Sequence, residues 1–352
     1  MGLVLAIGLG IWLLGYAMKV PRRQRWMLIA VLLGAVILGH LVLPDDAPLR
    51  RATGGTAAVW LMLLGLGAVV YGYISLLGQL RRRVAKQAPE QTPTGTFREV
   101  ELSRYARHMA LREIGGVGQR HLKEARVLVV GAGGLGAPAC LYLAAAGVGT
   151  IGVIDDDRVE NTNLQRQIIH RDQDIGVPKV FSAEQAMRAQ NPHIDVRPYH
   201  RRFSADIADE LFADYDLILE GSDNFETRYL VNQVAVAQGK PVVAAALTQW
   251  EGQISTYDPA NDAPCYACVF PTAPDPALVP SCAAAGVVGP LPGVLGSMMA
   301  LEAVKLITGA GDSLRGRLLL FDGLYSENRV MKVARNKDCP TCGTSALETE
   351  TL

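Results

Sequence analysis

The feature that most constrains the fold is a run of glycines between an apolar segment and a helix-forming segment. A short β-branched run, Arg126–Val130, leads directly into Gly131-Ala132-Gly133-Gly134-Leu135-Gly136. An alanine-rich stretch to Ala146 follows, and a second apolar run, Thr150–Ile154, ends in Asp155. This order of strand, glycine turn, helix, strand and acid, with the acid about 20 residues after the glycines, is typical of a Rossmann-like unit. The pattern therefore predicts an α/β domain built on a doubly wound sheet.

The glycine turn also predicts phosphate binding. Glycines at 131, 133, 134 and 136 let the backbone approach a phosphate closely, and the N-terminus of the following helix attracts anions. The carboxylate of Asp155 can accept hydrogen bonds from ribose hydroxyls. On this unit alone, an NAD-dependent oxidoreductase would be the default interpretation.

Residues beyond this unit favour a triphosphate. Arg166 lies within the amide-rich run 161–167, and Lys179 follows Pro178. Two cations near one nucleotide suit a triphosphate better than a pyrophosphate bridge. Asp223 follows the apolar run Leu217–Leu219, and an acid at the carboxyl end of a strand is well placed to hold magnesium. Taken singly, however, Arg166 fits a surface ion pair and Asp223 fits a helix N-cap equally well.

Four of the six cysteines form two CxxC pairs, Cys265 with Cys268 and Cys339 with Cys342. Two such pairs suit a tetrahedral structural zinc site, which would pin the C-terminal part of the chain to the domain. Two disulfides are the alternative.

The first 86 residues predict a membrane anchor. Hydrophobic residues make up 49% of the chain and charged residues 19%, and the apolar excess is concentrated near the N-terminus. Three apolar runs, 3–18, 26–43 and 57–80, are close to the roughly 17–25 residues of a spanning helix. We expect three transmembrane helices here, with the buried core helices of a soluble domain as the alternative.

Basic clusters follow the first and third runs, at Lys19–Arg25 and Arg81–Lys86. Because cytoplasmic flanks are enriched in Lys and Arg, we expect a multi-pass protein of the inner membrane with its C-terminal domain in the cytoplasm. Residues 87–100, which contain prolines and a glycine, read as a linker. The formal net charge of zero gives no reason to expect a nucleic acid partner.

Together these motifs resemble the MoeB/ThiF/HesA family, the bacterial relatives of ubiquitin-activating enzymes, and the molybdopterin-synthase adenylyltransferases in particular. The resemblance covers roughly 101–345, within a domain of 101–352, and we expect this chain to lack the rhodanese-like domain that some relatives append. The matching stretches are Arg104–Arg107, the glycine turn, Asp155 with Asp157, Asn163–Gln167, Lys179, Ser222–Asn224, both CxxC pairs, Glu251–Ile254, Cys282, Gly286–Pro290 and Glu302–Lys305.

The resemblance implies a homodimer that uses ATP to adenylate the C-terminal glycine of a ubiquitin-like sulfur-carrier protein ending in Gly-Gly, for molybdopterin or thiamine biosynthesis. ATP and its magnesium would be bound by the glycine turn, Asp155, Asp157, Asn163, Gln165, Arg166, Lys179, Asp223 and Asn224. Arg107 would reach into the partner protomer's site, and Cys282 occupies a position at which some relatives form a covalent adduct with the carrier.

Three other functions stay open. An NAD-dependent oxidoreductase would leave Arg166, Lys179 and the cysteine pairs unexplained. A non-catalytic membrane scaffold for a carrier protein would not require Arg166 or Asp223. Within the family, cyclodehydration of a threonylcarbamoyl-type substrate or adenylation of a peptide are possible, and the cysteines favour the sulfur-carrier branch.

Overall fold

The computed structural model describes residues 2–44, 47–54, 96–274 and 285–343, and part of 56–76. Contacts divide the chain into two units, Met1–Thr92 and Pro93–Leu352, and each is described by itself. Helix α5 begins at Glu99, slightly before the expected domain start at 101.

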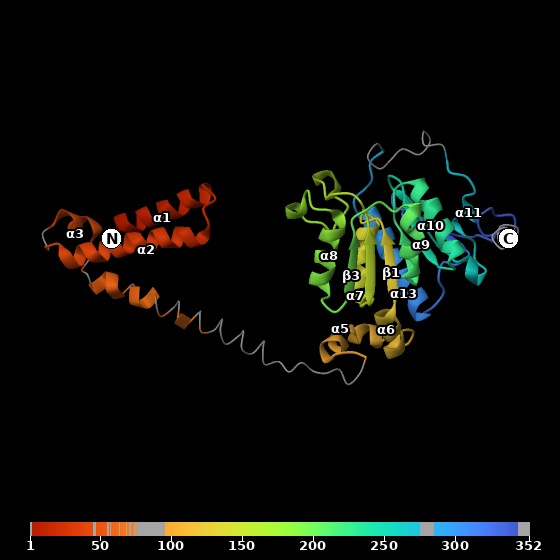
Figure 1. Ribbon diagram of the computed structural model, residues 1–352, viewed down its shortest axis with the longest axis horizontal. Coiled ribbons are helices and arrows are strands. Elements are labelled where there is room, and N and C mark those ends of the chain that lie inside the picture. The colour runs from red at the N-terminus through yellow and green to blue at the C-terminus, as the bar shows by residue number, and fades with distance from the viewer. Residues whose placement is uncertain are drawn as a thin grey trace. The chain divides into compact units, whose positions relative to one another are not determined.

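Strands and helices alternate along most of the second unit (Figure 1). Its strands are β1 Arg126–Val130, β2 Thr150–Ile154, β3 Asp195–Tyr199, β4 Leu217–Glu220, β5 Val242–Leu247, β6 Glu251–Tyr257, β7 Arg317–Asp322 and β8 Glu327–Lys332. Its helices are α5 Glu99–Met109, α6 Gly115–Glu124, α7 Gly136–Ala146, α8 Lys179–Gln190, α9 Ala205–Ala213, α10 Phe225–Ala237, α11 Tyr266–Val269 and α13 Pro290–Thr308. Short 3-10 turns are η1 Asn161–Asn163, η2 Asp172–Asp174 and η3 Pro259–Asn261.

All eight strands form one sheet in the order β3-β2-β1-β4-β5-β6-β7-β8. Strands β1 to β5 are parallel, and the order reverses direction between β1 and β4, as the prediction of a doubly wound sheet requires. The remaining strands are antiparallel, so the sheet is mixed, which the sequence interpretation did not anticipate. The direction of β6 follows from a tight connection after β5, where Thr248 N donates to Glu251 O over 2.8 Å, because a turn this short can join only antiparallel strands.

Two hydrophobic cores lie on opposite faces of the sheet. One combines alternate strand residues such as Val129 and Leu219 with α7, α8 and α13. The other combines the intervening residues, such as Leu128 and Ile218, with α9 and α10. Strands buried on both faces read as continuous apolar runs, which is why β1 and β2 could be recognised from the sequence.

Helix α13 packs closely on the glycine turn and on α7. A Cβ on Gly296 would lie 2.2 Å from Leu135 O, and one on Gly134 would lie 3.0 Å from Pro292 Cβ. Because a Cβ on Gly296 would overlap a backbone oxygen, nothing larger than glycine fits there without a shift, and the backbone of α13 packs directly on the residue before α7.

The N-terminal unit contains α1 Gly2–Ala17, α2 Arg22–Val42 and α3 Pro48–Thr53. The expectation of three transmembrane helices is wrong for the described residues. Of their helices, only Gln24–Val42 and Pro290–Thr308 are long and apolar enough to cross a membrane, and the second is the core helix α13. Helix α1 has 16 residues, fewer than a span needs, and the described apolar helix of the third run is the shorter Ala58–Gly67.

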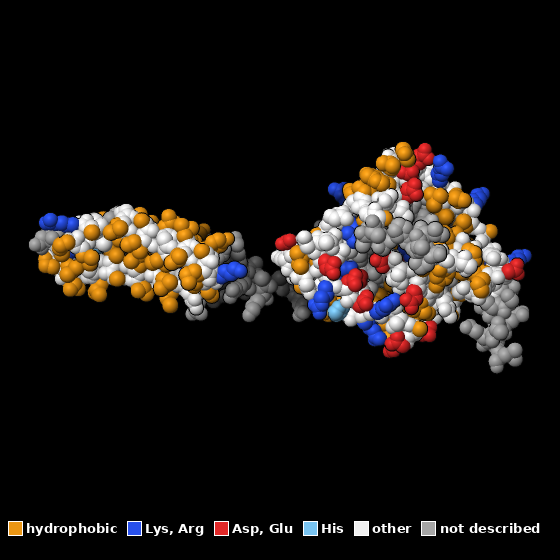
Figure 2. All heavy atoms as spheres, turned by 90° about the horizontal axis from the view of Figure 1, so that it is seen from above, with side chains coloured by type: hydrophobic (Ala, Val, Ile, Leu, Met, Phe, Trp, Pro, Cys, Tyr) orange, Lys and Arg blue, Asp and Glu red, His pale blue; other side chains and the backbone are white. Residues whose placement is uncertain are grey.

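Apolar side chains cover the visible face of the N-terminal unit, and Lys and Arg side chains gather near its ends (Figure 2). Leu5, Leu14 and Leu38 are more than half exposed, and the candidate span Gln24–Val42 is only 11% buried. Exposed apolar surface on this scale is not typical of a free soluble unit.

Candidate nucleotide site and metal centre

The glycine turn lies between the carboxyl end of β1 and the first residue of α7, as predicted. Gly131 has a φ of +94°, which favours glycine. A Cβ on Gly136 would lie only 1.9 Å from Gly131 O. Both positions therefore require glycine for the chain to pass from strand to helix.

The turn presents free backbone donors. The N–H groups of Gly133 and Gly134 make no hydrogen bond to any described residue. Both residues are partly exposed and precede the N-terminus of α7, where the helix dipole is positive. This arrangement is suited to binding a phosphate.

Asp155 supports the turn from the end of β2. Its Oδ2 accepts from Ala132 N over 2.7 Å, and its Oδ1 accepts from Asp157 N over 2.8 Å. Burial raises the pKa of Asp155, while Lys179 and these two N–H groups oppose the increase. Each oxygen keeps a second acceptor site, so binding of a ribose hydroxyl by Asp155 stays a prediction.

Lys179, the first residue of α8, lies beside Asp155 and Asp157. Its Nζ is 2.6 Å from Asp157 Oδ2, and the lysine is buried while the aspartate is exposed. A buried ammonium next to the turn provides positive charge where a phosphate chain would lie.

The segment 161–167 borders the turn on another side. Arg166 Cγ lies 3.8 Å from where a Cβ on Gly134 would be. Its guanidinium donates to Asn163 Oδ1 over 3.2 Å and to Thr162 O over 3.1 Å, which leaves further N–H donors. Gln165 is exposed and its backbone contacts Gly289, the residue before α13.

Gln167 was not selected from the sequence, yet it lies at the turn. It is buried, its Nε2 lies 3.7 Å from where a Cβ on Gly133 would be, and its Oε1 has no hydrogen-bond partner among the described residues. Because a buried amide oxygen normally has a partner, Gln167 is a candidate to bind the nucleotide.

The loop after β4 contacts the turn directly. A Cβ on Gly131 would lie 3.1 Å from Gly221 O. Asp223 in this loop is exposed, which suits a ligand for an incoming cation. Asn224 instead caps α10, its Oδ1 accepting from Thr227 N over 2.8 Å. The N-cap role considered for Asp223 thus belongs to Asn224, and ATP binding by Asn224 stays a prediction.

A buried ion pair beneath this loop was missed by the sequence interpretation. Arg228 Nε lies 3.5 Å from Glu220 Oε2, and Arg228 Nη2 donates to Ser222 O over 2.8 Å. Glu220 is 1% exposed, and burial raises its pKa while Arg228 opposes the increase. The pair lines a small cavity of about 10 Å³, which is room for one water molecule. Arg228 therefore fixes the backbone next to Asp223.

Arg107 does not join this site within one chain. It lies on α5, where the neighbouring Tyr105 OH accepts from Asn191 Nδ2 over 2.8 Å, just beyond the end of α8. Tyr105 also contacts Gly147, which precedes β2. Helix α5 therefore lies at the amino-terminal ends of β2 and β3, whereas the glycine turn lies at the carboxyl end of β1, on the other side of the sheet along the strand direction. Cys282 lies outside the described residues.

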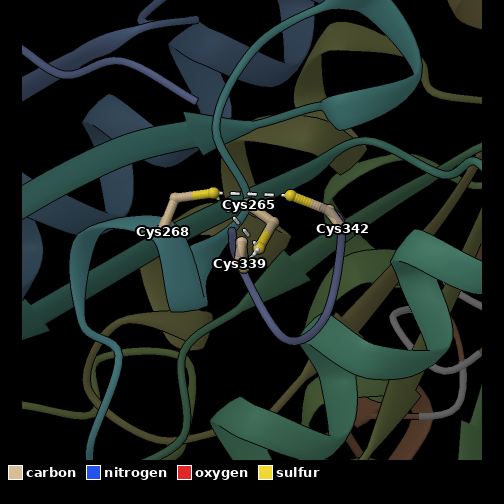
Figure 3. Close-up of side chains that lie close together, drawn as sticks. All are labelled: Cys265, Cys268, Cys339 and Cys342. Atoms are coloured by element: carbon tan, nitrogen blue, oxygen red, sulfur yellow. Dashed lines mark hydrogen bonds between the residues drawn. The ribbon is translucent and has the colours of Figure 1, made fainter. Parts of the chain in front are cut away.

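The four cysteines of the CxxC pairs meet at one point (Figure 3). The Sγ–Sγ distances are 3.8 Å for Cys265 and Cys268, 3.6 Å for Cys265 and Cys339, and 3.4 Å for Cys268 and Cys342. These distances exceed a disulfide bond of about 2.05 Å and are close to the roughly 3.8 Å between thiolates around a tetrahedral zinc. The cluster could bind zinc, as predicted, and the disulfide alternative is wrong for these four residues, which are free.

Two N–H donors face the sulfur atoms. Asn232 Nδ2 lies 3.7 Å from Cys265 Sγ, and Asn336 N lies 3.4 Å from Cys268 Sγ. Such donors stabilise thiolates and orient metal ligands. Since Asn232 and Arg228 are both on α10, this helix connects the cysteine cluster to the loop of Asp223.

Comparison with known proteins identifies relatives of this arrangement. The model of the ThiF family matches residues 105–341. The sulfur carrier protein adenylyltransferase of Thermus thermophilus is 48% identical over 254 residues, which are 71% of this chain and 94% of that protein. The SAMP-activating enzyme E1 of Haloferax volcanii is 47% identical over 248 residues, 70% of this chain and 91% of that protein.

A probable adenylyltransferase/sulfurtransferase MoeZ from Mycobacterium tuberculosis is 47% identical, over 72% of this chain but only 65% of MoeZ. Among solved structures, Escherichia coli MccB has a TM-score of 0.61 at 21% identity, over 72% of this chain and 77% of MccB. PaaA has a TM-score of 0.60 at 20% identity, over 85% of this chain and 90% of PaaA. At these identities the two structures establish the fold.

Proposed function

Because this chain belongs to the ThiF family, we propose that it is an adenylyltransferase that activates a ubiquitin-like sulfur-carrier protein with ATP. The carrier's C-terminal glycine carboxylate attacks the α-phosphorus of ATP, which gives an acyl-adenylate and releases pyrophosphate. The observation that carries this proposal is the grouping of Arg166, Lys179 and Asp223 around one glycine turn, in a chain that is 48% identical over 254 residues to a sulfur carrier protein adenylyltransferase.

The residues divide the work between positioning and charge. The free N–H groups of Gly133 and Gly134 bind phosphate oxygens, while Arg166 and Lys179 offset the negative charge on the triphosphate. Asp223 would hold magnesium, which would offset part of the negative charge of the triphosphate. No general base is needed, because a carboxylate is already ionised at neutral pH.

The other candidate functions fit less well. A dinucleotide oxidoreductase has no use for both Arg166 and Lys179 beside the turn. A non-catalytic scaffold does not require Asp223, exposed beside the turn, to be an acid. Adenylation of a peptide remains a related alternative, because MccB shares the fold and its structure was solved with MccA-N7isoASN.

ATP–pyrophosphate exchange tests the proposal. We expect exchange that depends on a carrier protein ending in Gly-Gly, and we expect Asp223→Ala to abolish it while the fold is retained. Glu210→Ala, on the exposed face of α9, is the matched control and should exchange normally. A protein that binds NAD but not ATP would contradict the proposal.

We further propose a homodimer in which Arg107 acts on the partner's nucleotide. Arg107 is exposed, makes no ion pair or hydrogen bond with the described residues, and lies at the sheet edge away from its own glycine turn. A second copy of the chain could bring this guanidinium to the triphosphate.

We also propose that the cysteine cluster holds zinc, and that the N-terminal unit attaches the enzyme to the inner membrane with the second unit in the cytoplasm. The apolar surface of α1 and α2 and the basic residues that flank them support membrane attachment. Recovery of the full-length protein in a high-salt wash of membranes, instead of a detergent extract, would contradict this attachment.

A further inference from the structure

His170 connects the glycine turn to α8 through a buried chain of hydrogen bonds. His170 Nε2 lies 3.0 Å from Ala132 O, and Nδ1 lies 2.9 Å from Ser182 Oγ. Ser182 Oγ in turn donates to Asp174 Oδ2 over 2.8 Å. His170, Ser182 and Asp174 are all buried, so bulk water cannot replace a missing partner.

This chain of contacts requires more protons than neutral side chains provide. The Ala132 carbonyl and the Asp174 carboxylate, at the two ends, are acceptors only. Three contacts need three protons, but the Ser182 hydroxyl supplies one and a neutral imidazole supplies one. The full set of bonds forms when the His170 ring is doubly protonated and donates from both nitrogens.

The contact with Ala132 determines where the next amide points. The peptides are trans, so the carbonyl of Ala132 and the N–H of Gly133 point in opposite directions. Asp155 holds the Ala132 N–H from one side and His170 holds the Ala132 carbonyl. The Gly133 N–H is thereby turned away from the His170 ring and left without a protein acceptor among the described residues.

We propose that His170 is a positioning residue of the nucleotide site, and that binding of the triphosphate draws onto its ring the proton that completes these bonds and fixes Gly133 N–H toward the phosphates. This inference rests on ATP as the nucleotide, as proposed above. It assigns a function to a histidine that makes no contact with the reacting atoms.

The charges around the ring give the coupling its sign. Asp174 faces the ring from η2 and Lys179 faces it from α8, while the glycine turn contributes only the Ala132 carbonyl. Burial lowers the pKa of His170 below its usual value and Lys179 adds to the decrease, although Ala132 and Asp174 oppose it. A bound triphosphate offsets the Lys179 charge and raises the pKa of His170 again. Binding therefore takes up protons, and ATP affinity should increase as pH falls toward the pKa of the free enzyme.

Calorimetric titration of magnesium ATP, without carrier, in buffers of different ionisation enthalpy measures this uptake, from about pH 5.5 to 8. His170→Gln keeps an N–H near the Nε2 position but cannot take up a proton. We expect its ATP affinity within about threefold of wild type and its proton uptake reduced to that of the ATP phosphates themselves. His170→Asn reaches only toward Ser182, and we expect it to bind ATP about tenfold more weakly.

His200→Gln is the matched control, because His200 Nε2 lies 3.1 Å from the carbonyl oxygen of Asp156 but His200 is exposed. It should match the wild type in affinity and proton uptake. Equal proton uptake by wild type and His170→Gln would overturn the inference, even if His170→Asn does not fold. If the protein binds ATP without this His170-dependent proton uptake, the adenylation proposal stands and only the role of His170 is wrong. If the wild-type protein does not bind ATP, both proposals are wrong.

Discussion

Lys179 is held by Asp157 in the protein without nucleotide: their 2.6 Å contact joins a buried ammonium to an exposed carboxylate at the edge of the glycine turn. Asp157 therefore has two possible roles, as a partner that stabilises the buried lysine and as the ATP ligand that the sequence predicted. The two roles have opposite effects on ATP-induced stabilisation.

Asp157→Asn separates them. Removing the carboxylate leaves Lys179 without its charged partner, at a cost between the roughly 1 kcal/mol of an exposed pair and the 3–5 kcal/mol of a buried one. If Asp157 mainly stabilises Lys179, the variant melts lower without ATP, and ATP raises its melting temperature more than in wild type, because the triphosphate becomes the missing partner. A smaller ATP-induced shift would instead identify Asp157 as an ATP ligand. Differential scanning calorimetry with and without magnesium ATP measures both shifts.

Gly136→Ala should destroy the nucleotide site. The added methyl group would overlap Gly131 O, so the turn must move, at a cost of about 1–3 kcal/mol or more. We expect ATP binding to fall below detection in titration calorimetry. Gly116→Ala on α6 is the control, since a Cβ there meets no atom within 4 Å and should leave stability equal or higher.

Arg228→Met should destabilise the domain by about 3–5 kcal/mol, because Glu220 is then buried without its cation. The double variant Glu220→Met with Arg228→Met should regain much of this stability in urea unfolding. It should still lose pyrophosphate exchange, because the Ser222 carbonyl beside Asp223 is no longer held. Full activity of the double variant would show that Arg228 serves stability alone.

Zinc removal should release the segment around Cys339 and Cys342 and lower the melting temperature. We expect about one zinc per chain in fresh protein and much less in Cys339→Ser, both by metal analysis. Cys140→Ala is the control, because burial raises the pKa of Cys140 to about 12 and keeps that thiol out of metal chemistry. Full zinc content in Cys339→Ser would exclude this ligand set.

Arg107→Ala and Asp223→Ala should each be inactive, and mixing the two proteins should restore part of the exchange activity. Mixed dimers regain one site with both residues intact. No recovery after subunit exchange, shown by labelled protomers, would mean that each chain works alone.

The parts of the fold that follow local rules were predictable. The conformations of the glycine turn and β1 depend on residues adjacent in sequence, so both elements could be predicted at the positions where the structure has them. The direction of β6 depends on the tight turn after Leu247, which lacks the Asn-Gly or Asp-Gly pair that usually indicates a hairpin.

Residues whose role depends on distant partners were not predictable. Nothing in the sequence next to His170 indicates its role, because its partners Ala132 and Ser182 lie 38 and 12 positions away along the chain. Glu220 directly follows the apolar run that ends at Leu219 and is the last residue of β4. Its buried carboxylate is stabilised by Arg228, which the sequence alone does not place beside it. The prediction of three membrane spans was wrong because apolar composition alone does not determine the length of a helix. Helix α1, for example, has only 16 residues.

The backbone contact between Gly296 and Leu135 has a consequence for interpreting natural variants. Gly296 lies more than a hundred residues after the glycine turn in the sequence. A search restricted to the GxGxxG motif would therefore not identify a substitution of Gly296 as harmful to the nucleotide site. A methyl group at Gly296 would overlap the carbonyl oxygen of Leu135, the residue before α7. We therefore expect a variant with alanine at this position to lose nucleotide binding. A functional nucleotide site therefore depends on two segments, the glycine turn and the part of α13 around Gly296. The sequence of both segments is needed to judge whether a variant protein is functional.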